Sequence, residues 1–138
     1  MAEGFLRHLM EQKGRRDMQI MSAGTGALPG MGPTLETVQV MWEQGVDVSG
    51  HLSQQLTPDL IYHADAIFCM EDFHRDEVLA MEPEAEGKTN LLRVFGVADP
   101  GPDAGVPDPI GQPIGVYQIC ARTIVEAVKR VADWIEKP

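Results

Sequence analysis

Apolar and polar positions alternate along the 138-residue chain in a way that predicts helices separated by short extended segments. Helical spacing of apolar side chains, at intervals of three and four residues, is found in residues 1–14, 34–45, 72–81 and 114–137. Thr34 is a favourable N-cap and Gly45 a favourable stop for the second of these segments. Thr57-Pro58 predicts the start of a further short helix, because proline is well accommodated in a first helical turn.

Three short apolar runs predict β-strands, at residues 18–22, 64–70 and 90–95. The run from Ala64 to Met70 has a continuous apolar centre, which is typical of a strand covered on both faces in a parallel sheet. Strands that alternate with helices favour an α/β fold with right-handed crossovers. With 43% apolar residues and no internal repeat, residues 1–138 are expected to form one domain with its own core.

Charge and cysteine content narrow the possible partners. A formal net charge of −10, with no basic cluster beyond residues 13–16, disfavours nucleic acid and anionic membranes as partners. No apolar run reaches the roughly 18 residues of a membrane span, and the first residues do not resemble a signal peptide. Cys69 and Cys120 are expected to be buried thiols in a reducing compartment. We therefore expect a cytoplasmic protein.

The proline-rich segment from Val106 to Tyr117 holds one carboxylate, Asp108, between Pro107 and Pro109. Proline fixes its own φ and restricts the residue before it, so Asp108 has little conformational freedom. A carboxylate fixed in this way suits a proton donor. Ordinary turn chemistry is the alternative interpretation of the same residues.

Several segments, taken together and in this order, resemble the low-molecular-weight protein tyrosine phosphatase family in its bacterial form. They are Met1 to Arg7, Ser22-Ala-Gly-Thr-Gly-Ala27, Gly45-Val-Asp-Val-Ser-Gly-His51, Gln55-Leu-Thr-Pro58, Ala64 to Glu71, Asp108-Pro-Ile-Gly111 and Val116-Tyr117. The resemblance implies a three-layer, Rossmann-like parallel sheet with helices on both faces. It also implies hydrolysis of phosphoric monoesters through a phosphocysteine, without cofactor or metal, on a phosphorylated protein or a small phosphomonoester. It does not indicate an oligomeric state.

The resemblance also assigns roles to individual residues. Asp108 matches the general acid of the family, and Ser22 and His51 match residues that support the phosphate-binding loop. Leu28 and Ile110 match positions that line the substrate cleft. Both are aliphatic here, which weakens a strict preference for phosphotyrosine, because aromatic stacking contributes roughly 0.5–1.5 kcal/mol beyond area burial.

One departure from the family pattern affects the whole interpretation. In the family, a strand and a loop of the pattern Cys, five residues, Arg precede a helix that begins Met/Ile-Ala-Glu, and here the chain begins at that methionine, Met1. We expect the first strand, the nucleophilic cysteine and the phosphate-binding arginine to be lacking, and the chain to be inactive as written and of low stability.

Two hypotheses for this departure stay open. In the first, the sequence starts at an internal methionine of a phosphatase. In the second, the chain is a non-catalytic remnant or a module that binds anions at the start of its first helix. A protein-arginine phosphatase and an arsenate reductase on the same fold are further alternatives, although a reductase needs additional cysteines near the nucleophile.

Other residues could be mistaken for site residues. Cys69 and Arg75 have the spacing of a phosphate loop, but the intervening Glu71 and Asp72 would repel a phosphate dianion. We therefore expect Cys69 to be an ordinary thiol at a strand end. Asp99 and Asp103 are expected to be solvated acids. No three-ligand pattern forms around the histidine and acid pairs His63 with Asp65 and His74 with Asp72, which disfavours a metal site.

Overall fold

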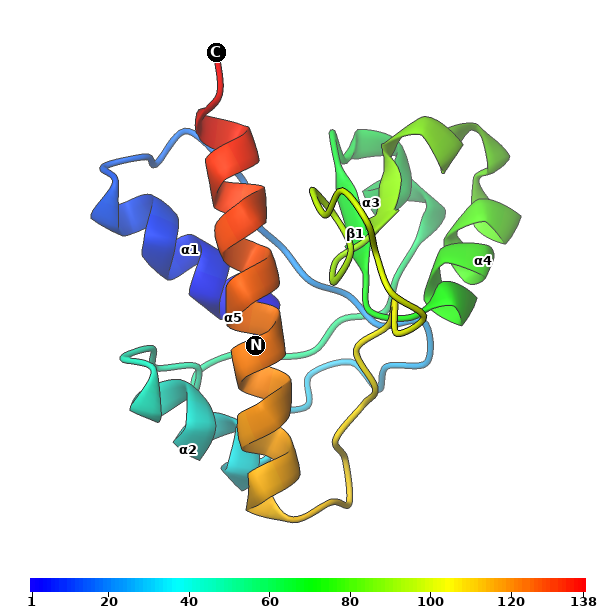
Figure 1. Cartoon of the computed structure of the whole chain (residues 1–138). Coiled ribbons are helices and arrows are strands. Elements are labelled where there is room, and N and C mark those ends of the chain that lie inside the picture. Colours follow the sequence, from blue (N-terminus) through cyan, green and yellow to red (C-terminus); the bar gives the residue numbers. More distant parts are fainter.

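The computed structural model describes residues 1–138, which form helices around a small parallel sheet (Figure 1). In chain order the elements are α1 (Ala2–Gln12), α2 (Leu35–Glu43), α3 (Pro58–His63), β1 (Ile67–Cys69), α4 (Asp72–Met81), the 3₁₀ helix η1 (Pro83–Lys88), β2 (Thr89–Leu91) and α5 (Ile114–Glu136). Each predicted helix is present, with boundaries within about two residues of those expected from the sequence.

The sheet is a single parallel pair of strands, β1 and β2, in which Ile67 pairs with Thr89 and Cys69 with Leu91. The connection between them runs through α4 and η1, as a parallel crossover requires. One further parallel contact, an isolated bridge between Gly24 and Gln55, lies outside these strands. The predicted α/β fold class is therefore confirmed.

Alternation along β1 sends its side chains to two separate hydrophobic clusters. Phe68 packs against the main cluster, which is built on α1, α2 and α5. Ile67 and Cys69 pack into a smaller cluster with Ile61 of α3 and Val78 of α4. Figure 1 shows the same division, with α3 and α4 on one side of β1 and α1, α2 and α5 on the other. Helices thus cover both faces of the sheet, as successive side chains of a strand require.

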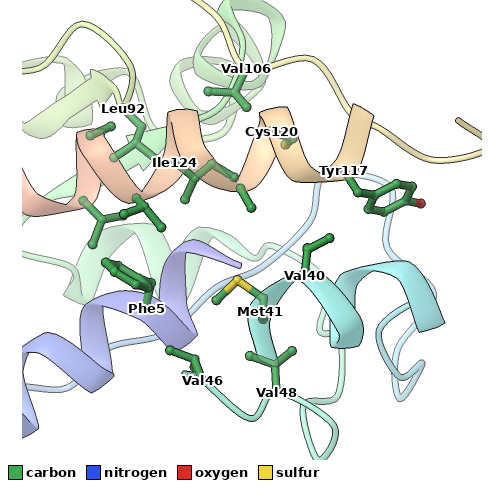
Figure 2. Packing of buried hydrophobic residues seen from close by; sticks show 14 of the residues in the cluster. Phe5, Val40, Met41, Val46, Val48, Leu92, Val106, Tyr117, Cys120 and Ile124 are labelled. Carbon is green, nitrogen blue, oxygen red and sulfur yellow. The ribbon is translucent and has the colours of Figure 1, made fainter. Parts of the chain in front are cut away.

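The main core forms where α5 crosses α1 and α2 (Figure 2). Val128 and Val131 of α5 are almost completely buried, and so is Met41 of α2. Phe5 of α1 points into the same cluster. Because nine residues of α5 are buried along one face, this helix holds the N-terminal half of the chain together.

Local chemistry accounts for where the shorter helices start. The hydroxyl of Thr34 accepts a hydrogen bond from the Thr37 amide at 3.2 Å, and Thr57 does the same for the Leu60 amide. These side chains satisfy amides that a first helical turn leaves without partners. Gly45 follows α2 with a φ of +81°, a conformation that glycine adopts without steric cost.

Two predictions of strand were wrong in whole or in part. Residues 18–22 contain no strand, and the run expected at 90–95 is extended only as far as Leu91. The chain turns after Leu91, with the Phe95 amide bonded to the Leu92 carbonyl at 3.3 Å. Apolar alternation alone does not make a strand, because the backbone groups also need a neighbouring strand to pair with.

Candidate active site

Asp108 lies on an exposed turn between α5 and the sheet. One carboxylate oxygen of Asp108, Oδ1, accepts a hydrogen bond from the Ile110 amide at 3.0 Å. The turn closes with a bond from the Gln112 amide to the Pro109 carbonyl and with Gly111 at a φ of +78°. The side chain therefore keeps a defined orientation while its carboxylate remains accessible to solvent.

Cys120 of α5 lies beneath this turn. Its Sγ is 4.0 Å from the carbonyl oxygen of Pro107, the residue before Asp108. Burial raises the pKa of the Cys120 thiol, the Met1 α-ammonium opposes this shift, and the Asp108 carboxylate adds to it. Burial also lowers the pKa of the Met1 α-ammonium. The start of α1 and the Asp108 turn therefore lie close enough to Cys120 to act on the same thiol.

A second group of site residues converges on Glu3, in the first turn of α1. Ser22 donates its hydroxyl to Glu3 Oε1 at 3.1 Å, and Arg7 donates to Oε2 at 3.2 Å. His51 Nδ1 lies 3.4 Å from the same Oε2. The Glu3 side chain is only 12% exposed, so the three polar partners compensate for its partial loss of solvent.

Glu3 is the member of this group that the sequence did not single out. The signal was its place in the Met1-Ala-Glu3 start of a helix, but nothing local showed that Ser22 and His51 would meet there. The two predicted loop-supporting residues, Ser22 and His51, lie 29 positions apart along the chain and are joined through this one carboxylate.

The Glu3 group faces a cavity of about 420 Å³ between α1 and the Gly45–His51 loop. Its lining includes Met1, Ser22 and His51, but not Asp108. Met1 therefore relates to both groups, because it lines the cavity beside Glu3 and its α-ammonium acts on the pKa of the Cys120 thiol.

The two predicted cleft residues lie on different loops. Ile110 is 66% exposed and belongs to the Asp108 turn. Leu28 is 71% exposed and lies on the loop after Ser22, where its carbonyl accepts a hydrogen bond from Ser53. Both side chains are free to contact a ligand.

The Cys69 and Arg75 pair does not form an anion site. Burial raises the pKa of the Cys69 thiol to about 11, although Arg75 acts in the opposite direction. Arg75 Nε donates a hydrogen bond to the Thr89 carbonyl at 3.2 Å, so the guanidinium is bonded to the backbone of β2. Glu71 caps α4 in a reciprocal arrangement with His74. Cys69 is therefore a protonated core thiol at neutral pH.

The remaining candidates have structural or solvent-exposed positions. His63 Nδ1 lies 2.9 Å from the Asp59 carbonyl, and Asp99 and Asp103 are exposed. No set of three or more histidine, cysteine or acidic side chains is arranged to hold a metal ion. None of the helices combines the length and the apolar character needed to span a membrane.

Known proteins resemble this chain in both sequence and fold. The protein-arginine-phosphatase of Geobacillus stearothermophilus is 30% identical over 128 residues, which cover 93% of this chain and 84% of that protein. The probable low molecular weight protein-tyrosine-phosphatase EpsP of Ralstonia nicotianae is 33% identical over 103 residues, or 72% of this chain and 68% of that protein.

Solved structures of phosphatases have a fold similar to that of this chain. The YwlE arginine phosphatase from Geobacillus stearothermophilus has a TM-score of 0.84 at 28% identity, with 98% of this chain and 82% of that chain covered. Vibrio vulnificus Wzb in complex with benzylphosphonate has a TM-score of 0.82 at 30% identity, with 96% and 86% covered.

The fold is thus the α/β fold of these phosphatases. A model of the low molecular weight phosphotyrosine protein phosphatase family matches residues 1–138. The chain belongs to this family.

Proposed function

We propose that residues 1–138 are a single domain that supplies the proton donor and the supporting residues of a phosphomonoester hydrolase. Asp108 is the general acid, and Ser22, His51 and Glu3 support the part of the site ahead of α1. The observation that carries the proposal is the position of Met1. The residue at the start of α1 lines the cavity of the Glu3 group and also acts on the Cys120 thiol beneath the Asp108 turn.

The chemistry assigned to Asp108 is the one that the family resemblance implies, and its accessibility and fixed turn support it. In a reaction through a phosphocysteine, the protonated carboxyl gives its proton to the leaving oxygen as the phosphorus–oxygen bond breaks. The resulting carboxylate then accepts a proton from the water that attacks the phosphocysteine. An exposed carboxylate on a rigid turn can reach a ligand oxygen without first breaking a buried contact.

We propose further that the 138 residues do not hydrolyse phosphomonoesters by themselves. Thiolate nucleophiles need a lowered pKa, whereas burial raises the pKa of both Cys69 and Cys120. Arg75 is bonded to the Thr89 carbonyl and is not placed to hold a phosphate. Turnover requires a loop of the pattern Cys, five residues, Arg joined ahead of α1.

The substrates are phosphorylated proteins or small phosphomonoesters, which the protein meets in the cytoplasm. Two unpaired, buried cysteines support a reducing compartment. The aliphatic cleft residues Leu28 and Ile110 support a substrate range that includes non-aromatic phosphoesters or phosphoarginine. Two relatives support both chemistries, because one is named a protein-arginine-phosphatase and the other a probable low molecular weight protein-tyrosine-phosphatase.

The test joins a family strand and its Cys, five residues, Arg loop to the N-terminus of Met1. The extended protein is expected to hydrolyse p-nitrophenyl phosphate, and Asp108→Asn is expected to reduce kcat by roughly 10²–10⁴. Asp103→Asn is the matched control, because Asp103 is an exposed acid of the same loop. Equal rates for Asp108→Asn and Asp103→Asn would contradict the assignment of Asp108.

Anion binding without turnover is a second candidate function. The first amides of α1 have no helical acceptors, and the Met1 α-ammonium lies beside them. Calorimetric titration of the 138-residue chain with inorganic phosphate tests this function directly. If this function is present, phosphate binding is expected to be saturable and to be weakened by N-terminal acetylation. Heat that is unchanged by acetylation would contradict a site at Met1.

A further inference from the structure

Two arginine side chains connect the backbone ahead of Asp108 to the sheet and to α5. Arg93 Nη1 donates a hydrogen bond to the Gly105 carbonyl at 2.9 Å. Arg130 of α5 donates to the Arg93 carbonyl at 2.6 Å and to the Phe95 carbonyl at 2.9 Å. Arg130 of α5 therefore fixes the backbone around Arg93. The Arg93 side chain then fixes the loop that contains Gly105.

The next residue of the loop is fixed from another side. The Val106 amide donates to the Met70 carbonyl at 2.7 Å, and the Val106 side chain is only 5% exposed in the main core. Gly105 is packed closely, because a Cβ added there would lie 3.4 Å from the Met70 carbonyl oxygen. Residues 105 and 106 are thus held by three adjoining attachments: a guanidinium, a backbone bond and a buried side chain.

Little freedom remains between this anchor and the proton donor. Only Pro107 separates Val106 from Asp108, and Pro109 restricts Asp108 itself. The carbonyl of Pro107 also lies against the Cys120 thiol. A shift of the anchored pair is therefore transmitted to the Asp108 carboxylate instead of being absorbed by flexible backbone.

We propose that Arg93 is a positioning residue for the general acid. It touches neither substrate nor reacting atoms, and it acts by holding the Gly105 carbonyl so that the Asp108 turn keeps one orientation. The proposal rests on the role of Asp108 given above. A charged donor is suited to this task because hydrogen bonds from ionised groups are roughly twice as strong as neutral ones.

The test measures amide hydrogen exchange and ¹⁵N relaxation in the 138-residue chain, so it needs no turnover. The variant Arg93→Met is expected to speed exchange of the Val106 amide at least tenfold and to lower the Ile110 order parameter from about 0.85 to below about 0.6. Exchange of the Val128 amide, in the core of α5, is expected to change less than twofold. Arg93→Lys keeps a charged donor and is expected to restore most of the protection.

Arg122→Met is the matched control, because Arg122 is an exposed arginine of α5 that lines a groove away from the Asp108 turn. It should leave both the Val106 and Ile110 readouts unchanged. Unaltered Val106 and Ile110 in Arg93→Met would overturn the proposal, and so would a uniform increase in exchange that includes Val128.

If Arg93→Met does not fold, Arg93→Gln is measured against the same criteria, since its neutral, shorter side chain cannot replace the guanidinium. The outcome is separable from that of the proposed function. Loss of activity in the loop-bearing Asp108→Asn protein, together with an unaltered Val106 amide in Arg93→Met, would remove only the role of Arg93.

Discussion

At the scale of single residues, Glu3 does more than its sequence context indicates. It accepts hydrogen bonds from Ser22 and Arg7 and lies beside His51, so one carboxylate joins α1 to two distant loops. The Asp108 turn, in contrast, owes its geometry to neighbouring residues, because Pro107 and Pro109 flank Asp108. The first arrangement depends on the tertiary structure and the second on local sequence.

Removing the Glu3 carboxylate tests that dependence. Glu3→Ala is expected to lower the free energy of unfolding by about 0.5–1.5 kcal/mol, because Ser22 and Arg7 lose a charged hydrogen-bond acceptor but are themselves exposed to solvent. Urea denaturation measures the change. Glu11→Ala, at an exposed position of the same helix, is the control and should shift stability by no more than about 0.5 kcal/mol. Equal effects for the two variants would show that the Glu3 group contributes nothing to the fold.

The buried thiol of Cys69 predicts a loss of stability at alkaline pH. Its folded pKa of about 11 is higher than that of an unfolded cysteine, so the unfolded state releases its proton first. Because the folded pKa is the higher one, the protonated thiol contributes fully to the free energy of unfolding below about pH 8.5. This contribution, roughly 3 kcal/mol in all, is lost as the pH rises toward 11. Urea melts at pH 8 and pH 10.5 measure the loss. Cys69→Ala should show a smaller decrease than wild type, and an identical decrease would contradict the assignment.

At the scale of elements, close packing of α1 against the Val46–Val48 segment sets what the helix tolerates. Gly4 has no Cβ, and one added there would lie 2.7 Å from Val48 Cγ1. The main core depends on this approach, because Val46 and Val48 are both buried in it. A residue with poor helical propensity therefore occupies the first turn of α1 for reasons of packing.

Substitution of two helical glycines separates propensity from packing. Gly4→Ala is expected to destabilise the protein by about 1–3 kcal/mol, as overpacked core sites do. Gly115→Ala in α5 has open space around its Cβ and should stabilise by about 0.5–1 kcal/mol. Thermal or urea unfolding gives both values. In a Val48→Ala background the cost of Gly4→Ala should disappear, and a cost that persists would show that contact with Val48 is not its cause.

The helices were predictable from sequence because their signal is internal to each segment, as the apolar face of α5 and the cap at Thr34 illustrate. The strands were less so, since residues 18–22 have the apolar pattern of a strand but lack the paired neighbour. The Asp108 turn followed from its own prolines. The bond from Arg93 to Gly105 could not be inferred, because it joins separate segments that only the folded chain brings together.

At the scale of the whole molecule, the chain is less compact than its size permits. Its accessible surface is 8590 Å², compared with about 7,100 Å² expected for a folded monomer of this mass. The sheet is only two strands wide, and its neighbours Gly24 and Gln55 share a single bridge. Strands with one pairing partner leave backbone groups on the other edge without partners in the sheet.

We therefore predict low stability for the 138-residue chain. Its thermal midpoint is expected below about 45 °C, the lower end of the range for mesophilic domains. Calorimetry and circular dichroism measure the midpoint and the cooperativity of the transition. A single cooperative transition above about 60 °C would show that the two-stranded sheet is sufficient for a fully stable domain.

The most direct test of the account is an assay of p-nitrophenyl phosphate hydrolysis by the purified 138-residue chain. The account predicts a rate no higher than that of the Cys69→Ser/Cys120→Ser double variant, because neither thiol is placed or ionised to attack phosphorus. Turnover that wild type supports and Cys69→Ser abolishes would contradict it, since the nucleophile would then lie on β1.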